Sequence, residues 1–209
     1  MKLFKNSHPM ILKNLELVML YIKVQQFKLK IVILAAGIGS RLGNPFPKPL
    51  TPLKNGETIM GRQLKNISAY FDINNVTTVV GFKKDLIMER FPEVNYVYNP
   101  YFDQTNTSKS LLQALKKHRG KSVLWLNGDV VFDEKLISVL LKDINEDNSF
   151  IAVNTSSVAE EEVKYTLKNN YVFKLSKKVK NALGEAVGIN FISKKDLELK
   201  SFNSQYFSF

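Results

Sequence analysis

From residue 29 onward, short apolar runs alternate with segments in which apolar residues recur every three or four positions. The runs are typical of buried strands, and the recurring spacing is typical of amphipathic helices. The expected strands are 29–34, 76–80, 94–98 and 122–126, and the expected helices are 59–70, 85–91 and 107–118. Because helices connect successive strands, the pattern predicts parallel pairing. The fold class we expect is α/β: a single-domain, Rossmann-like sheet, mixed but mainly parallel, with helices on both faces.

The first 28 residues lack this alternation. Their apolar run at 15–24 is interrupted by Glu16 and Lys23, so it is too short and too charged to cross a bilayer. No small-residue cleavage site of the kind that ends a secretory signal follows it. We therefore expect residues 1–28 to be an N-terminal extension, either a tail or an outer amphipathic helix, and residues 29–209 to form the domain.

Composition narrows the chemistry. A chain of 209 residues with 44% hydrophobic content can bury one sizeable core, which favours one domain. The chain has no cysteine and only two histidines, His8 and His118. This argues against thiol nucleophiles, disulfides, zinc clusters and a Ser-His-Asp triad. The absence of cysteine also fits a cytoplasmic enzyme.

The formal net charge of +11 predicts an anionic partner. Nucleic acid, an anionic membrane surface and phosphorylated small molecules all satisfy that charge. No nucleic-acid module and no interleaving of aromatic and basic residues accompanies it, so we favour phosphorylated small molecules and expect no nucleic-acid partner. A generally lysine-rich composition is the competing explanation. The oligomeric state stays open, a homo-oligomer included.

A glycine-rich loop follows the first expected strand. Without side-chain bulk at Gly37 and Gly39, backbone N–H groups can face phosphate oxygens, while Arg41 and Lys48 supply positive charge. A dinucleotide fingerprint is not favoured because Leu42 stands where its third glycine belongs, and the G-K-[ST] of a P-loop is absent. The strand-end and loop residues expected at a nucleotide are Leu34, Ala35, Ala36, Gly37, Gly39 and Ser40.

Polar and small residues follow the other expected strands too. Gly81, Asn99 and Asp129 each come directly or shortly after a strand, so they should meet Gly37 at the carboxyl edge of the sheet. Asp129 offers the hard oxygen ligand that Mg²⁺ requires, and we expect it to bind that metal. An Asn-Gly-Asp turn that only ends the strand is the alternative. Asp133 and Glu134 are expected to begin the next helix.

The segment L-A-A-G-x-G-x-R-L, at 34–42, and the P-K-P-L at 47–50 resemble the signature of nucleotidyltransferases that activate sugar phosphates and phosphorylated head groups. The resemblance implies a Mg²⁺-dependent enzyme that acts on a nucleoside triphosphate, with Arg41, Lys48 and Asp129 as catalytic residues. Together with two further segments, it covers about residues 29–192.

A second segment, at 99–111, resembles the N-x-x-[YF]-x-x-[TS]-N-x-x-S-L of cytidylyltransferases that act on phosphocholine, aminoethylphosphonate and similar head groups. In those enzymes the segment lies near the nucleotide. Asn106 and Ser110 are therefore candidate nucleotide contacts, as is Gly81 at the same edge. Capping of the helix at 107–118 by Asn106 or Thr107 is an equally good explanation.

A third resemblance to these enzymes joins the Val-Lys pair at 163–164, a second lysine at 177 and G-E-x-x-G-I at 184–189. It implies that Lys164 and Lys177 neutralise the acceptor phosphate and the α-phosphate, and that Glu185 closes the acceptor pocket. A solvated lysine-rich face between 174 and 180 is the alternative.

Together these features favour transfer of CMP from CTP to a small phosphorylated acceptor, with release of pyrophosphate. Phosphocholine, a phosphonate and a phosphorylated amide such as glutamine phosphate are candidate acceptors, with surface polysaccharide decoration as the purpose. The alternatives are a sugar-1-phosphate nucleotidyltransferase that uses UTP, dTTP or GTP, a metal-dependent glycosyltransferase, and an inactive nucleotide-binding protein. Enzymes of the resembled family continue with a second acidic metal ligand, so we expect a domain shortened at its C-terminal end, where only Asp196 or Glu198 could substitute.

Overall fold

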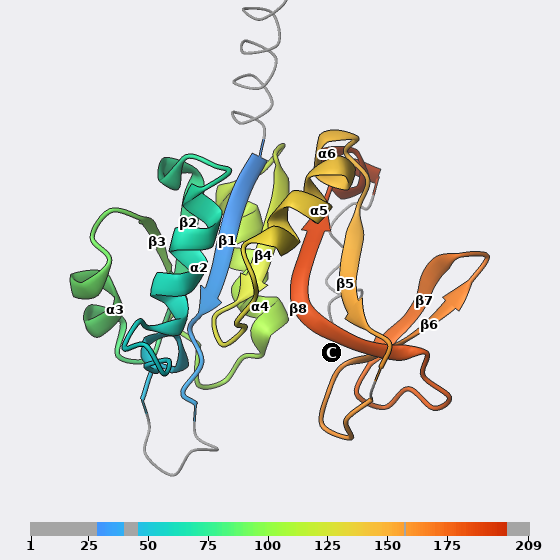
Figure 1. The fold of residues 1–209 in the computed structure, drawn as a ribbon, viewed down its shortest axis with the longest axis horizontal. Helices are drawn as coiled ribbons and strands as arrows, with labels where there is room; N and C mark the ends of the chain where they lie inside the picture. Colours follow the sequence, from blue (N-terminus) through green and yellow to red (C-terminus); the bar gives the residue numbers. More distant parts are fainter. Residues whose placement is uncertain (1–28, 40–45, 157, 200–209) are drawn as a thin grey trace, which may run out of the picture.

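The computed structural model describes residues 29–39, 46–156 and 158–199. The predicted extension at 1–28, the chain end at 202–209, and Ser40, Arg41 and Leu42 lie outside the described residues. Eight strands form one sheet in the order β3-β2-β1-β4-β8-β6-β7, and β5 pairs with β8 (Figure 1). The strands are β1 (Leu29–Ala35), β2 (Val76–Val80), β3 (Asn95–Tyr98), β4 (Ser122–Asn127), β5 (Phe150–Asn154), β6 (Lys164–Lys168), β7 (Tyr171–Ser176) and β8 (Gly184–Ile192).

The first four strands pair in parallel, as the sequence pattern predicts. Ile31 lies opposite Val76 on β2 and opposite Leu124 on β4, and β3 continues the sheet beyond β2. Strand β1 is buried along almost its whole length. A strand covered on both faces has no polar side, which explains why it reads as a continuous apolar run.

Strand β8 joins this parallel part to an antiparallel part. Its C-terminal half pairs antiparallel with β4, with Leu126 opposite Ile189. Strand β5 pairs antiparallel with β8 from Glu185 to Phe191, whereas β6 pairs only with Gly184 and Glu185 and forms a hairpin with β7. Gly188 lies between the two halves with φ +78°, a conformation that L side chains rarely adopt. The sheet is therefore mixed, and the hairpin lies to one side of the parallel strands (Figure 1).

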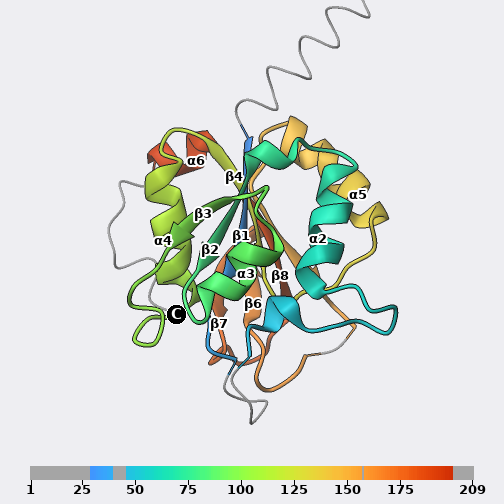
Figure 2. The same cartoon turned by 90° about the vertical axis from the view of Figure 1, so that its left-hand side faces the viewer.

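Helices cover both faces of the sheet, as predicted. α2 and α5 lie on one face and α4 and α6 on the other (Figure 2). The helices are α2 (Ile59–Ser68), α3 (Lys84–Arg90), α4 (Thr107–Lys117), α5 (Lys135–Asn145) and α6 (Lys194–Leu199), with short 3₁₀ helices η2 (Lys48–Leu50) and η3 (Ile73–Asn75). The largest difference from the expected helix limits is at α2, which ends at residue 68 rather than 70. Within the described ranges, no helix combines the length and apolar character needed to cross a membrane.

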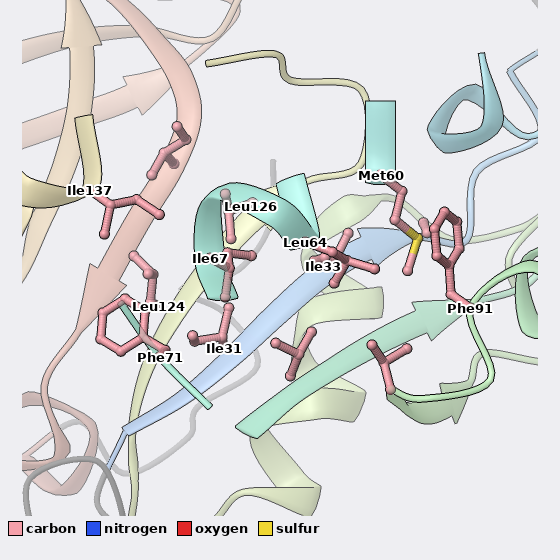
Figure 3. Close-up of a cluster of buried hydrophobic side chains, with 14 of the residues drawn as sticks. Ile31, Ile33, Met60, Leu64, Ile67, Phe71, Phe91, Leu124, Leu126 and Ile137 are labelled. Atoms are coloured by element: carbon pink, nitrogen blue, oxygen red, sulfur yellow. The ribbon is translucent and has the colours of Figure 1, made fainter. Parts of the chain in front are cut away.

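The core has two parts because successive residues of β1 face opposite sides. Ile31 and Ile33 pack with Met60 and Ile67 of α2, and Figure 3 shows this cluster. Val32 and Leu34 belong to a second cluster with Leu111, Ala114 and Leu115 of α4. A strand fixed from both faces holds the loop that follows it in a defined position.

Candidate functional site

A cleft of about 700 Å³ lies at the carboxyl ends of β1 and β4. The parallel part of the sheet contributes the end of β1, the loop after it, η2 and the end of β4. The antiparallel part contributes β8 and the segments beside it. The residues that line the cleft are Leu34, Ala35, Gly37, Gly39, Lys48, Pro49, Thr107, Asn127, Gly128, Asp129, Val130, Ala159, Glu161, Glu162, Lys177, Glu185, Ala186, Val187 and Gly188.

Gly128 brings the end of β4 close to β1 and η2. Its N–H donates to Leu34 O at 2.9 Å. A Cβ at this position would lie 2.8 Å from Leu34 O and 2.8 Å from Pro49 Cγ, so only glycine fits without displacing backbone. The next residue, Asp129, is thereby placed beside Lys48.

Lys48 and Asp129 form an ion pair inside the cleft. Lys48 Nζ donates to Asp129 Oδ2 at 2.9 Å, and the two side chains are 35% and 43% exposed. Both groups thus remain accessible to a ligand. The lysine is held by η2, whose turn is closed by the Leu50 N–H donating to Pro47 O at 2.9 Å.

The glycines of the first loop differ in their surroundings. Gly37 is exposed, and a Cβ there would have no atom within 4 Å. Gly39 has φ +68°, and its Cβ would lie 2.9 Å from Phe46 O. Gly39 is thus required by the backbone, whereas Gly37 leaves open space in the cleft. Arg41 and Ser40, which the sequence assigns to the same loop, lie outside the described residues.

The opposite wall carries three glutamates and one lysine. Glu161, Glu162 and Glu185 line the cleft together with Lys177. Glu185 is already engaged, because its Oε2 accepts the Ala159 N–H at 2.8 Å and its Oε1 accepts Asn154 Nδ2 at 3.2 Å. It fastens the segment before β6 to β8. This wall therefore combines positive and negative charge.

Lys164 is predicted to contact the acceptor, yet it does not line the cleft. Its Nζ donates to Glu160 O at 3.0 Å and to Lys177 O at 3.5 Å. It connects the two ends of the hairpin and supports the backbone of Lys177. In this arrangement only Lys177 of the two lysines faces the cleft, and a direct contact from Lys164 stays a prediction.

Asn106 and Ser110 hold the start of α4. Asn106 Oδ1 accepts the Lys109 N–H at 3.2 Å and Ser108 Oγ at 2.7 Å, which is an N-cap. Ser110 Oγ is buried and accepts Asn99 Nδ2 at 3.0 Å. Neither residue lines the cleft, whereas Thr107 does. The capping that the sequence allowed is present, and the nucleotide contact remains a prediction.

Gly81 and Ala36 are also predicted nucleotide contacts, but neither lines the cleft. Ala36 O accepts the Phe82 N–H at 3.1 Å. A Cβ at Gly81 would lie 2.5 Å from Phe102 Cβ and 2.7 Å from Ala36 O. At Ala36 and Gly81 the loop after β1 therefore packs directly against the loop after β2. Leu34 and Ala35 do line the cleft.

The described residues contain no group of three His, Cys, Asp or Glu side chains that could hold a metal ion. Asp129 nevertheless suits Mg²⁺, which takes one or two carboxylates and completes its shell with water and substrate phosphate oxygens. The other acids predicted as substitutes, Asp196 and Glu198, do not line the cleft. Asp196 accepts from Ser193 Oγ at 3.0 Å, and Glu198 pairs with Lys194 at 3.5 Å.

Sequence reasoning did not assign Thr107, Glu161 or Glu162 to the site. The two glutamates precede the Val-Lys pair and read as part of an exposed charged turn, so only the folding of this turn against β8 reveals them. Thr107 directly follows the capping residue Asn106, and a cap signal does not tell which neighbour faces the ligand. Gly188 belongs to the G-E-x-x-G-I segment of the sequence, but its positive φ was not predicted.

The sequence model of one protein family, the MobA-like NTP transferase domain, matches residues 31–194 of this chain. The chain belongs to this family. The match includes every element that lines the cleft, from β1 to β8. This transferase domain therefore has the fold class and the family relationship that its sequence predicts.

Two curated relatives are similar to part of the transferase domain. The CMP-5'-(3-aminopropyl)phosphonate synthase of Streptomyces rubellomurinus is 35% identical over 118 residues, 52% of this chain and 18% of the relative. The bifunctional protein GlmU of Methanococcus aeolicus is 30% identical over 119 residues, 54% of this chain and 28% of the relative. The similarity thus spans less than a third of either relative's length.

Solved structures share the fold. The inositol-1-phosphate CTP transferase from T. maritima superposes with a TM-score of 0.63 at 17% identity, covering 86% of this chain and 75% of the other. The CTP:phosphocholine cytidylyltransferase from Streptococcus pneumoniae gives a TM-score of 0.56 at 20% identity, covering 79% and 71%. The transferase domain therefore shares the overall fold of these two solved structures.

Proposed function

We propose that the chain transfers CMP from CTP to a small phosphorylated acceptor and releases pyrophosphate. The observation that carries the proposal is one cleft that joins the Gly37 and Gly39 loop, the Lys48–Asp129 pair and Lys177. These groups come from both parts of the sheet. An enzyme that joins two phosphate-bearing substrates needs this combination of phosphate cradle, cations and a second wall.

In this reaction an oxygen of the acceptor phosphate attacks the α-phosphorus of CTP. A new phosphorus–oxygen bond forms as the bond from the α-phosphorus to the oxygen bridging the β-phosphate breaks, and pyrophosphate leaves with that electron pair. The reacting groups are both anionic and repel each other. Lys48 and Lys177 reduce that repulsion and hold the phosphates in line, without a covalent intermediate on the protein.

Asp129 would hold Mg²⁺, whose positive charge stabilises the phosphate oxygens during transfer. When the cation and substrates are present, we propose that Lys48 leaves Asp129 and turns to a phosphate oxygen. We further propose that the loop carrying Arg41 completes the cationic environment.

The charges in the cleft support acceptors that carry both an anion and a cation. Lys177 suits the phosphate or phosphonate, while Glu161 and Glu162 on the same wall suit an ammonium group. Choline-like head groups, aminoalkyl phosphonates and a phosphorylated amino-acid amide have this chemistry. Decoration of a surface polysaccharide from the cytoplasm is the role we propose.

The choice of CTP draws support from the relatives. The names of the phosphonate synthase and of the two solved structures contain CMP or CTP. A sugar-1-phosphate nucleotidyltransferase is the second candidate, because one of the solved structures that share the fold, from Bacillus anthracis, carries the name of a glucose-1-phosphate thymidylyltransferase. A glycosyltransferase is disfavoured because Asn127-Gly128-Asp129 stands where its Asp-x-Asp motif would be, and because Lys48 suits a triphosphate.

Pyrophosphate release separates these candidates. CTP, UTP, dTTP and GTP are each incubated with Mg²⁺ and one acceptor: phosphocholine, 2-aminoethylphosphonate, glutamine phosphate or glucose 1-phosphate. We expect release with CTP and an ammonium-bearing acceptor. Release with UTP, dTTP or GTP and the sugar phosphate would support the second candidate instead. No release from any pair would contradict both.

A further inference from the structure

A second cavity of about 750 Å³ lies at the β6–β7 hairpin and the loop that follows it. It shares no lining residue with the candidate active site. The hairpin stands apart from the parallel strands (Figure 1). The cavity is therefore a separate concave surface, and nothing in the proposed transfer reaction uses it.

The lining of this hairpin cavity is cationic. Lys174, Lys178 and Lys180 line it, and the described residues of the lining include no aspartate or glutamate. The candidate active site, in contrast, mixes lysines with four carboxylates. A run of lysines usually forms a convex, solvated face. Here three of them converge on a concavity, where their fields add and an anion can contact more than one.

The same cavity contains an aromatic ring and an unsatisfied hydroxyl group. Phe173 lines it and is 58% exposed, with Lys168 Nζ 5.4 Å and Lys174 Nζ 5.8 Å from its ring centroid. Thr166 also lines it, and its buried Oγ1 has no hydrogen-bond partner among the described residues. A buried polar atom without a partner costs stability, which a ligand oxygen would restore.

We propose that the hairpin cavity is a second binding site for a nucleoside polyphosphate. The lysines would bind the phosphates, since ammonium groups act as point charges that suit phosphate oxygens in many geometries. The exposed ring of Phe173 would stack on the base. A ligand with only phosphates would leave that ring unused, and a neutral nucleoside would leave the lysines unused.

Occupancy of this site has a route to the active site. Lys177 lines the active site, while its neighbours Ser176 and Lys178 line the hairpin cavity. Ser176 Oγ accepts the Lys178 N–H at 3.2 Å, so the three residues form a tight turn. A ligand that fixes Lys178 fixes the backbone of Lys177. Because Lys177 lines the active site, ligand binding in the hairpin cavity should change the KM of the acceptor. That expectation rests on the proposed function, whereas ligand binding in the hairpin cavity does not.

The test measures CTP binding without acceptor by equilibrium dialysis. We expect the wild-type chain to bind CTP at two classes of site. Lys178→Gln/Lys180→Gln should weaken one class on the order of tenfold. Lys135→Gln/Lys142→Gln, a matched pair of exposed lysines on α5, should change neither. Lys48→Met should weaken the other class. Thermal unfolding of each variant verifies the fold.

A second comparison tests the nucleoside part. Phe173→Leu should weaken CTP at the hairpin cavity severalfold while leaving competition by inorganic pyrophosphate unchanged. Equal effects on CTP and pyrophosphate would overturn the stacking role and with it the nucleotide assignment.

Other results overturn the site as a whole. A single class of CTP site that Lys178→Gln/Lys180→Gln leaves intact would remove the hairpin cavity from consideration. Binding of phosphatidylserine vesicles, lost in that variant while CTP binding is unchanged, would make the surface a membrane contact instead. If Lys178→Gln/Lys180→Gln weakens one class of CTP site but Lys48→Met weakens neither, the second site stands and the proposed function fails.

Discussion

Lys48 Nζ lies 2.9 Å from Asp129 Oδ2, although the two residues are 81 positions apart in the chain. The pair is more than one-third exposed, so it contributes little to the free energy of unfolding. Its position follows from the close approach of Gly128 to β1 and η2. The two opposite charges therefore lie together at the carboxyl ends of β1 and β4, although they add little to the stability of the fold.

Removing either charge should slow the reaction and leave the fold intact. We expect Lys48→Met and Asp129→Asn each to lower kcat on the order of a hundredfold or more, because each removes a charge that, in the proposed reaction, helps to stabilise the transferring phosphates. Pyrophosphate release measures this effect. The melting temperature should change by only about a degree or two, as for the loss of an exposed ion pair.

Lys54→Met is the matched control for the lysine, because Lys54 is exposed on the turn after η2 and does not line the cleft. It should retain the wild-type rate. Wild-type rates in both Lys48→Met and Asp129→Asn would show that the cleft is not where phosphoryl chemistry occurs.

Two glycines of the cleft should separate stability from activity. Gly128→Ala places a Cβ 2.8 Å from Leu34 O, so we expect it to lower the free energy of unfolding by about 1–3 kcal/mol. Gly37→Ala meets no atom within 4 Å and should leave stability nearly unchanged. Because the new methyl group enters the space where we propose that phosphates approach the backbone, turnover should fall roughly tenfold or more.

Chemical denaturation and pyrophosphate release on the same two variants check this pair. A Gly37→Ala protein with full activity would mean that the phosphates do not approach this part of the loop. A Gly128→Ala protein as stable as the wild type would show that β1 and η2 can move apart there.

The parallel half of the sheet could be predicted because its strands are buried on both faces. Ile31 and Ile33 pack on α2 while Val32 and Leu34 pack on α4, and this double burial leaves a continuous apolar run in the sequence. Strand β7 gives a weaker signal, since its first four residues are exposed. Its pairing depends on contacts with β6 rather than on burial.

A residue of the cleft could be predicted where a single polar residue follows a strand. The prediction was weaker where two neighbouring residues could each have lined the cleft. Asp129 is separated from the end of β4 only by Gly128, so the strand fixes where its side chain can lie. Lys164 and Lys177 both lie at the hairpin, and spacing does not tell which ammonium finds a backbone carbonyl and which faces the cleft. The same ambiguity separates Asn106, the cap, from Thr107, which lines the cleft.

Glu162 should select acceptors that carry an ammonium group. Glu162→Gln keeps the size of the side chain and removes its charge, so we expect the KM of an ammonium-bearing acceptor to rise roughly tenfold with little change in kcat. The KM of glucose 1-phosphate should not rise. Steady-state kinetics with phosphocholine and 2-aminoethylphosphonate check the effect.

Glu160→Gln is the control, since Glu160 is exposed two positions earlier and does not line the cleft. If Glu162→Gln and Glu160→Gln raise the KM equally, the effect is long-range attraction rather than recognition in the cleft. A rise of the same size for glucose 1-phosphate would also contradict selection by charge.

His118 should make the fold less stable in mild acid. Its Nε2 lies 2.9 Å from Thr77 Oγ1, and burial, aided by Lys30 and Lys117, lowers the pKa of the imidazole to about 4. Above pH 6.5, its ordinary value, folded and unfolded chains both hold it neutral. As the pH falls from 6.5 toward 4, only the unfolded chain gains the proton, so the free energy of unfolding decreases. After allowance for partial exposure the loss is about 2 kcal/mol.

His118→Gln has no such proton, and the difference in unfolding free energy between wild type and variant should shift by that amount across this range. Urea unfolding at pH 7, 5.5 and 4.5 measures it, and a difference that does not vary with pH would mean that the folded chain binds the proton as readily as the unfolded one.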